Sequence, residues 1–379
     1  MALVLSEEQI ELREVARKLV QGKSPVESLR KLRDECSEAG YSEDLWREMS
    51  ELGWAGILVP ERHGGAGLGY RELGVVLQEC GRNLVASPLF STALLGVTAL
   101  NVGGSKEQHA LHLPAIAAGE KLVALAHEER SHHRGLRVGC KAERSAGGFR
   151  LSGEKRFVLD GHVADILVVS ARVSGAEGES DGVTLFLVDA RAPGVHVTRT
   201  HMVDSHNAAL VRLDGVAVGP ESLLGEQGQG ARTLLRVLDA GCAGVSAQML
   251  GGAEEAFRRT VEYLKQRQQF GVPIGSFQAL LHRAARMFCE LELAKTVVLD
   301  ALAALDEDRA DASAAVSVAK AHLDETFHLV SNESIQLHGG IGMTDEHEIG
   351  FFLKRARVLA QTFGDETFHA DRFAALNGY

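Results

Sequence analysis

Two long helical patterns meet at a short turn over residues 267–278, and this junction constrains the fold more than any other stretch. Apolar residues recur at helical spacing over residues 233–266 and again over residues 279–305. The turn between them holds two glycines and a proline, a combination that ends a helix. The sequence therefore predicts two long antiparallel helices of a bundle, joined at one end by a tight turn.

Three small residues recur at intervals of three or four within the first pattern: Gly244, Ala247 and Gly251. Residues at this spacing share one face of a helix, and small side chains on that face let a second helix pack at short range. We therefore expect another helix to cross this face closely.

The turn also brings three chemically different side chains to one end of the bundle: Arg267, Phe270 and Gln278. A guanidinium suits a pyrophosphate, and an aromatic ring packs on a flat heterocycle. Arg267 could equally be a cation at a helix C-terminus, where it meets the helix dipole. The turn alone therefore leaves both roles open.

Helical and strand patterns divide the chain into three parts. Residues 1–120 are mostly helical, with patterns over 6–20, 41–52, 69–81, 88–102 and 106–113, the first opened by a capping box at Ser6 and Gln9. Residues 121–224 alternate, and predict strands over 148–158, 165–172, 183–189 and 208–216, with an exposed hairpin loop at 175–182. Residues 225–379 are helical again. We therefore expect an N-terminal helical domain, a middle β-barrel or sandwich and a C-terminal helical bundle.

Charge and cysteine content exclude several functional classes. The formal net charge of −11 argues against nucleic acid or an anionic membrane as partner. No apolar run reaches the roughly 18 residues of a membrane helix, and the first residues lack the features of a signal peptide. The five cysteines form no CxxC pair, which favours reduced thiols. These features predict a soluble cytoplasmic protein.

Three motifs in sequence order resemble the acyl-CoA dehydrogenase family. They are the Leu-Gly-Trp-Ala-Gly-Ile-Leu-Val-Pro-Glu segment at 52–61 with Gly-Gly-Ala-Gly-Leu at 64–68, the Arg-x-x-Phe-Gly turn at 267–271, and Gln-Leu-His-Gly-Gly-Ile-Gly at 336–342. The resemblance covers residues 6–372 and implies that family's α+β fold, with a four-helix C-terminal bundle. It also implies FAD as cofactor, an acyl-CoA substrate desaturated between its α and β carbons, and an electron-transfer flavoprotein as acceptor.

The same resemblance assigns cofactor contacts to residues that reach the FAD of a neighbouring subunit. Arg267 would meet the pyrophosphate and Phe270 would pack on a ring. The adenine side would be met by Gln278, Gln336, Gly339 and Gly340. Taken singly, Gly339 and Gly340 could merely end a helix and Gln336 could lie on its surface. All of them together in family order favour the cofactor role.

The residues that the family uses for its own chemistry are altered. Matching the glycine of the family's Tyr-Glu-Gly-Thr-like turn to Gly364 aligns its catalytic glutamate with Phe363 and leaves Asp365 and Glu366 out of register. Matching on Arg372 instead moves Asp365 towards the glutamate position, so both registers stay open. A second family position for the base falls near Gly241, with Asp239 two residues away on the helix. We expect Asp365 to be a turn or cap residue and Asp239 to lie on a solvated helix face. The catalytic base in this chain is therefore unknown, with Asp365, Glu366 and Asp239 as candidates.

The flavin-holding segment is altered as well. The family's Thr-Glu-Pro-Gly-Ala-Gly-Ser-Asp motif is replaced by His-Glu-Glu-Arg-Ser-His-His-Arg over residues 127–134, and Leu159 replaces a threonine expected near the flavin. Candidate metal ligands in this segment are His127, His132 and His133. A polar loop of this kind is more often solvated, so we expect no metal.

These losses fall on one side of the shared site, which suggests a division of labour. The residues for a neighbour's flavin are kept, whereas those for the chain's own flavin are degraded. The hypothesis is a subunit of a heterotetrameric (α2β2) acyl-CoA dehydrogenase, resembling the actinobacterial enzymes that act on steroid-derived CoA thioesters. Three alternatives remain open: a self-sufficient homotetrameric dehydrogenase with a relocated base, a flavin monooxygenase or amine oxidase of the same fold, and a purely structural subunit.

Overall fold

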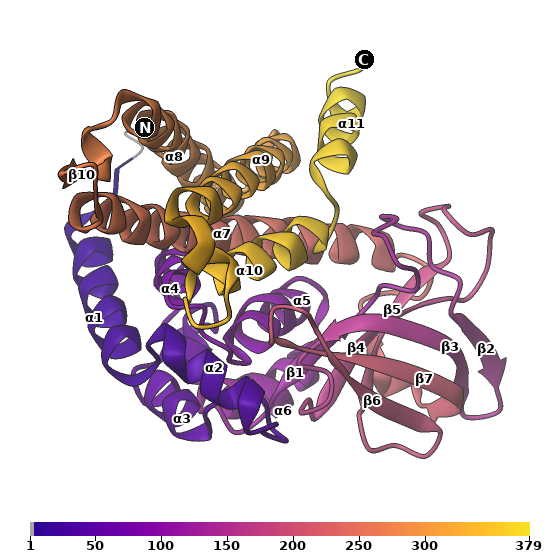
Figure 1. The fold of residues 1–379 in the computed structure, drawn as a ribbon. Coiled ribbons are helices and arrows are strands. Elements are labelled where there is room, and N and C mark those ends of the chain that lie inside the picture. Colours follow the sequence, from indigo (N-terminus) through magenta and orange to yellow (C-terminus); the bar gives the residue numbers. More distant parts are fainter. Residues whose placement is uncertain (1–3) are drawn as a thin grey trace. The chain divides into compact units, whose positions relative to one another are not determined.

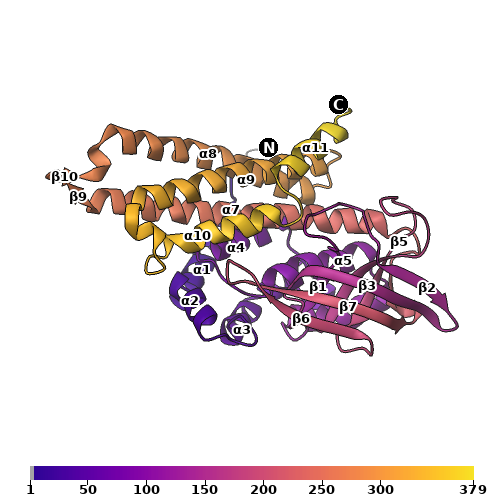
Figure 2. The same cartoon turned by 45° about the vertical axis from the view of Figure 1, so that its right-hand side comes forward.

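A computed structural model describes residues 4–379, which group into two compact units. The helical unit consists of residues 4–34, 70–85 and 242–379. The β unit consists of residues 35–69 and 86–241. Each unit is described by itself below, and both are built from segments that lie far apart in the sequence (Figures 1 and 2).

The helical unit is a bundle of long helices. Its elements are α1 (Glu7–Lys23), α2 (Val26–Asp34), α4 (Tyr70–Arg82), α7 (Gly230–Gln266) from Cys242 onward, α8 (Gln278–Asp306), α9 (Ala312–His338), α10 (Ile349–Gln361) and α11 (Glu366–Leu376). Helix α9 packs against α8, α10 and α11, whereas α4 packs against α1 and α8. The two long helices expected around the 267–278 turn are confirmed as α7 and α8. The sequence missed α2.

Helix α1 begins where the sequence predicts. The Ser6 side chain accepts a hydrogen bond from the Gln9 backbone, and the Gln9 side chain accepts one from the Ser6 backbone, which forms the expected capping box. The same reciprocal pair opens α6 (Lys106–Ala117) in the β unit, between Ser105 and Gln108.

The close helix approach expected at Gly251 is confirmed. A Cβ built on Gly251 would lie 1.8 Å from the backbone oxygen of Gln78, on α4. The approach is reciprocal, since a Cβ on Gly81 of α4 would lie 2.1 Å from the backbone oxygen of Gln248. The backbones of α4 and α7 therefore touch where neither helix carries a side chain.

The β unit combines short helices with one sheet. Its helices are α3 (Glu43–Glu51), η1 (Trp54–Gly56), η2 (Glu61–His63), η3 (Leu89–Gly96), α5 (Val97–Gly103), α6 and η4 (Pro220–Ser222). Its strands are β1 (Val123–Ala126), β2 (Lys141–Ser145), β3 (Gly148–Leu159), β4 (Ile166–Arg172), β5 (Val183–Asp189), β6 (Val195–His201), β7 (Asn207–Val218) and β8 (Leu223–Leu224). The predicted helix over 88–102 is η3, a π-helix, continued by α5.

Seven of the eight strands follow the order β6-β7-β3-β2-β4-β5-β8, and the eighth, β1, pairs in parallel with β4. Strands β4 and β5 are antiparallel and enclose the predicted exposed loop at 175–182. The four strands that alternation predicted are β3, β4, β5 and β7. Strands β1, β2, β6 and β8 were missed. One face of the sheet buries a continuous apolar core that includes Leu151, Phe186 and Val211.

The boundaries placed at residues 120 and 224 stay predictions. None of the described residues belongs to a helix long and apolar enough to cross a membrane. All five cysteines are free thiols, with Cys36 and Cys289 exposed and the other three buried. Burial raises the pKa of Cys80 to about 12.

Candidate functional site

The turn between α7 and α8 is a two-stranded hairpin at the tip of the helical unit (Figure 2). Strand β9 (Gln268–Gln269) pairs with β10 (Val272–Pro273), and η5 (Ile274–Ser276) leads into α8. Phe270 and Gly271 form the bend with φ of +54° and +81°. Positive φ strains a residue with a Cβ, so this conformation holds Phe270 at the apex at some cost.

The three side chains singled out in this turn are all exposed. The Arg267 guanidinium takes part in no hydrogen bond or ion pair with any side chain of residues 4–379. Phe270 is 91% exposed, and its ring lies edge-on to that of Phe277, with centroids 6.0 Å apart. Gln278 is the first residue of α8. A cation and an aromatic ring are thus displayed without the partners that folding alone would give them.

A stack of rings brings the second predicted loop to the same end of the bundle. The buried His338 at the end of α9 stacks on Tyr263, one helical turn before Arg267, with ring centroids 4.5 Å apart. Burial lowers the pKa of His338, and its Nδ1 lies 2.7 Å from the Ser334 carbonyl oxygen. The neutral ring therefore acts as a spacer between α7 and α9.

The backbone beyond this spacer is open. Gly339 adopts φ +65° and ψ −142°, a region that favours glycine, and opens η6 (Gly339–Met343). A Cβ on Gly339 or Gly340 would meet nothing within 4 Å, and Gln336 is exposed one turn earlier. The positive φ of Gly339 already favours glycine there, whereas the packing of the chain does not explain the glycine at 340.

Together these features fit a diphosphate-bearing cofactor. The six predicted residues, Arg267, Phe270, Gln278, Gln336, Gly339 and Gly340, lie at one end of the helical unit and are exposed. A free guanidinium matches phosphate oxygens, a displayed ring matches a flat heterocycle, and bare glycine backbone permits close approach. Five of these six residues, all except Gln278, belong to the sequence motifs at 267–271 and 336–342. The sequence did not predict the stack of His338 on Tyr263 that joins the two motifs.

The segment that replaces the flavin-holding motif is only partly solvated: residues 130–132 and Arg134 are exposed, whereas its first three residues are folded into the β unit. His127 is 3% exposed, its Nδ1 lies 3.0 Å from Ser170 Oγ, and its Nε2 lies 2.9 Å from the Gly135 carbonyl oxygen. Burial lowers its pKa to about 4, so the imidazole is neutral. The expectation of a solvated loop is therefore wrong for His127, because its ring is buried and both ring nitrogens have hydrogen-bond partners.

A buried lysine completes this network. Lys155 is fully buried, and its Nζ donates to the His127 carbonyl oxygen, Glu129 Oε1 and Ser170 Oγ at 3.2, 2.6 and 3.0 Å. Glu129 also accepts from the backbone amides of Gly139 and Cys140. Burial alone would raise the pKa of Glu129, but Lys155 and the two amides outweigh it and lower the pKa. The polar side chains of His127 and Glu129 are thus held by partners within the β unit.

The same segment contains a metal-like cluster. Ligand atoms of His127, Glu128 and His133 all lie within 4.8 Å of one another. Both ring nitrogens of His127 already have partners, and His133 Nδ1 lies 2.5 Å from Glu128 Oε1. A metal would have to break these contacts, so the prediction of no metal is kept.

The three candidate bases have different surroundings. Asp365 is the N-cap of α11 and accepts a hydrogen bond of 3.0 Å from the Phe368 amide, as expected of a cap residue. Glu366 is exposed, and its pKa is raised by slight burial and by the neighbouring carboxylates of Glu325 and Asp365. Asp239 is only 4% exposed, so its expected place on a solvated helix face is wrong. The apolar pattern of α7 is nearly continuous there, which buries both flanks of the helix.

The turn around Phe363 and Gly364 is closed by a lysine that sequence reasoning missed. Phe363, which the match on Gly364 aligns with the family's glutamate, is buried and has φ +58°. The fully buried Lys320 donates to the carbonyl oxygens of Ala360 and Gly364 at 3.0 and 2.8 Å, and to Asp324 Oδ1 at 2.7 Å. The Lys–Asp spacing of four residues on an apolar helix face was the available signal.

The comparisons with known proteins agree with this geometry. Profiles of the acyl-CoA dehydrogenase N-terminal, middle and C-terminal domains match residues 6–120, 127–216 and 228–375. The acyl-CoA dehydrogenase IpdE2 of Mycolicibacterium smegmatis is 31% identical over 95% of this chain and 96% of its own length. The chain belongs to the acyl-CoA dehydrogenase family.

Two solved structures of this family extend the match. A variant of the Tcur3481-Tcur3483 steroid acyl-CoA dehydrogenase has a TM-score of 0.87 and 34% identity, with 98% of both chains covered. The ChsE4-ChsE5 complex of Mycobacterium tuberculosis has a TM-score of 0.90 and 26% identity, with both chains fully covered. The chain therefore has the three-domain fold of a family of oxidoreductases that normally bind FAD.

Proposed function

We propose that this chain is one subunit of a heterotetrameric α2β2 acyl-CoA dehydrogenase, and that it completes the FAD site of its partner. The observation that carries the proposal is an asymmetry within the chain. The residues that would serve a neighbour's FAD are exposed and unused, as at Arg267 and Phe270. The segment that would hold the chain's own flavin is occupied by the His127–Lys155–Glu129 network.

The missing base supports the same division. Phe363 is buried at the glutamate position, and Lys320 fixes the turn around it from inside. Asp365 is committed to capping α11. A carboxylate from the partner subunit would remove the α-proton of the thioester. FAD supplies the acceptor for the β-hydride, and an electron-transfer flavoprotein would reoxidise it.

This chain's own residues would bind and orient the cofactor from outside. The Arg267 guanidinium would neutralise the pyrophosphate, and Phe270 would cover a ring face. The side of the adenine would be met by Gln278, Gln336, Gly339 and Gly340. The structural relatives include the Tcur3481-Tcur3483 steroid acyl-CoA dehydrogenase and the ChsE4-ChsE5 complex. This supports a bulky, steroid-derived acyl-CoA as the substrate class.

The experiment compares variants of this chain in a complex with its partner. Arg267→Ala removes the guanidinium, and a charge-assisted contact of this kind is worth about 1.5–3 kcal/mol, so FAD affinity should fall roughly 10- to 100-fold. Arg267→Lys should recover part of the loss, because lysine keeps the charge without the planar fork. Arg286→Ala, at an exposed arginine on the same unit, serves as the control.

FAD affinity is read from the release of bound flavin on dilution, with circular dichroism to confirm folding. Unchanged affinity in Arg267→Ala would refute the role in trans. A yellow homotetramer that desaturates an acyl-CoA unaided would point to the self-sufficient alternative with Asp365, Glu366 or Asp239 as base. Reduced-nicotinamide-dependent oxygen uptake would mark a monooxygenase, and a complex without FAD a structural subunit.

A further inference from the structure

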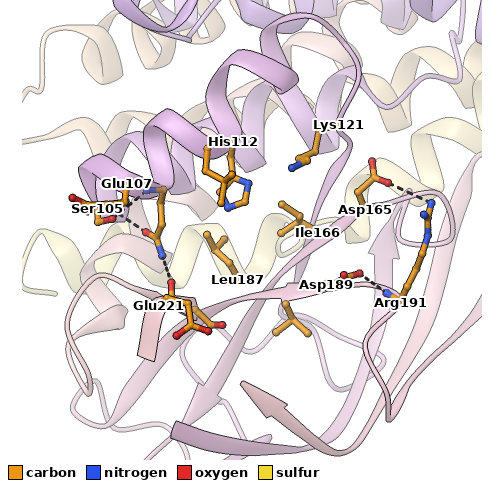
Figure 3. A pocket seen from close by; sticks show the side chains of 14 residues that line it. Ser105, Glu107, His112, Lys121, Asp165, Ile166, Leu187, Asp189, Arg191 and Glu221 are labelled. Carbon is orange, nitrogen blue, oxygen red and sulfur yellow. Dashed lines mark hydrogen bonds and ion pairs between the residues drawn. The ribbon is translucent and has the colours of Figure 1, made fainter. Parts of the chain in front are cut away.

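A pocket lies in the β unit, among residues that the proposed function does not use (Figure 3). It has a volume of about 570 Å³ and lies between α6, the start of β4, the end of β5 and η4. This volume is in the range of small-molecule sites. All of its lining residues belong to the β unit.

The floor of this pocket is apolar. It is formed by Ile166, Leu187 and Val188, which the sheet buries to 9% exposure or less. Leu111, on α6, is 66% exposed at the rim. A bound molecule would therefore cover apolar surface below and gain a further apolar contact at the side, so part of it should be hydrocarbon.

Two nitrogen-bearing side chains above this floor have no partner that folding provides. His112 projects from α6 into the pocket, and its Nδ1 is buried without a hydrogen-bond partner (Figure 3). The Lys121 ammonium points toward the same ring and takes part in no ion pair of the described residues. Burial, and then the charge of Lys121, lower the pKa of His112. A buried polar atom without a partner is costly. An acceptor placed between the two side chains would accept hydrogen bonds from the Lys121 ammonium and from His112 Nδ1 in the tautomer that protonates this nitrogen.

The remaining charges restrict the total charge of a ligand. Asp165 Oδ2 accepts from the Leu122 amide at 2.9 Å, and Asp165 Oδ1 lies 3.5 Å from the Arg191 guanidinium. Asp189 Oδ1 accepts from the Arg191 backbone amide at 2.8 Å. Glu107 and Glu221 stand at the opposite end of the pocket (Figure 3). These carboxylates would repel a nucleotide or another polyanion. The pocket thus combines one free cation, one free imidazole nitrogen and an apolar floor within an acidic surround.

We infer that this pocket binds a small monocarboxylate with an aliphatic or aromatic body. The carboxylate would lie between Lys121 Nζ and His112 Nδ1, and the body would lie on Ile166 and Leu187. This site is independent of the proposed FAD contacts, all of which lie in the helical unit. Its test can therefore fail or succeed without affecting the proposed function.

The experiment measures binding of hexanoate to the purified chain by isothermal titration calorimetry. The expected result is saturable one-site binding, weakened roughly tenfold or more in Lys121→Met. Leu187→Gln should also weaken binding, because it places an amide in the floor. Lys141→Met, at an exposed lysine on β2, is the matched control and should bind as the wild type does. Hexylamine and hexanol, which share the body but lack the carboxylate, should bind at least tenfold more weakly.

Three outcomes would overturn the inference. The first is no binding of hexanoate at millimolar concentration. The second is binding that Lys121→Met leaves unchanged while circular dichroism shows a folded variant, because the carboxylate would then lie elsewhere. The third is tighter binding of hexylamine than of hexanoate, which would assign the pocket to a cation held by Glu107 and Glu221.

Discussion

Replacing Lys320 by methionine should destabilise the helical unit strongly. The substitution removes a fully buried ammonium whose three donors are satisfied by Asp324, Ala360 and Gly364, and it leaves Asp324 buried without its cation. Removing one partner of a buried ion pair costs about 3–5 kcal/mol. Burial raises the pKa of Asp324 to about 7 despite Lys320, so the measurement belongs at pH 8, where the Asp324 carboxyl is mostly ionised.

The assay is urea denaturation followed by circular dichroism at 222 nm, arranged as a double-mutant cycle. Asp324→Leu removes the other partner, and Lys320→Met with Asp324→Leu should recover most of the loss, because neither charge is then left buried alone. Lys265→Met is the control, since its side chain is 65% exposed and its ion pair with Glu262 should contribute less than about 1 kcal/mol. The role of Lys320 in holding α9 to the turn at Gly364 would be refuted by a loss of less than about 1 kcal/mol in the free energy of unfolding of Lys320→Met. Additive losses in the double variant would also refute it.

Two further substitutions test the packing of each unit. Burial lowers the pKa of His127 to about 4, so only the unfolded chain takes up this proton between pH 6.5 and 4, and the free energy of unfolding falls there by up to about 3 kcal/mol. The urea midpoint of the wild type should therefore fall between pH 7 and pH 4.5 by more than that of His127→Gln. An equal fall in the two proteins would contradict this prediction. Gly251→Ala places a Cβ 1.8 Å from the Gln78 oxygen and should cost about 1–3 kcal/mol, whereas Gly350→Ala, with open space, should cost nothing. Equal thermal midpoints for the two variants would contradict the close approach.

Local patterns predicted most of the fold. The capping box at Ser6, the turn at 267–278 and the strands β3, β4, β5 and β7 all carry signals within a few residues of one another. Strand β2 was missed because four of its five residues are exposed, and β6 because none of its residues is buried, so neither shows an apolar face in the sequence. Helix α2 was missed because it has only nine residues and buries only Val26 and Leu29.

The candidate site was only partly predictable, because its decisive contacts join distant residues. The motifs around Arg267 and Gly339 were visible, but the stack between Tyr263 and His338 depends on how α7 and α9 pack. The burial of His127 was hidden for the same reason, since its partners Ser170 and Lys155 come from other strands. A row of polar residues reads as solvated until the sheet that covers it is known.

The measurement that tests the central claim most directly is the FAD content of this chain alone and in a complex with its partner. The chain is purified by itself and after coexpression with a candidate partner of the same family, and flavin absorbance is compared with molecular mass. We predict a colourless chain alone and a yellow α2β2 complex with about one FAD per pair of chains. A chain that binds a full complement of FAD alone and oxidises an acyl-CoA without a partner would contradict the account.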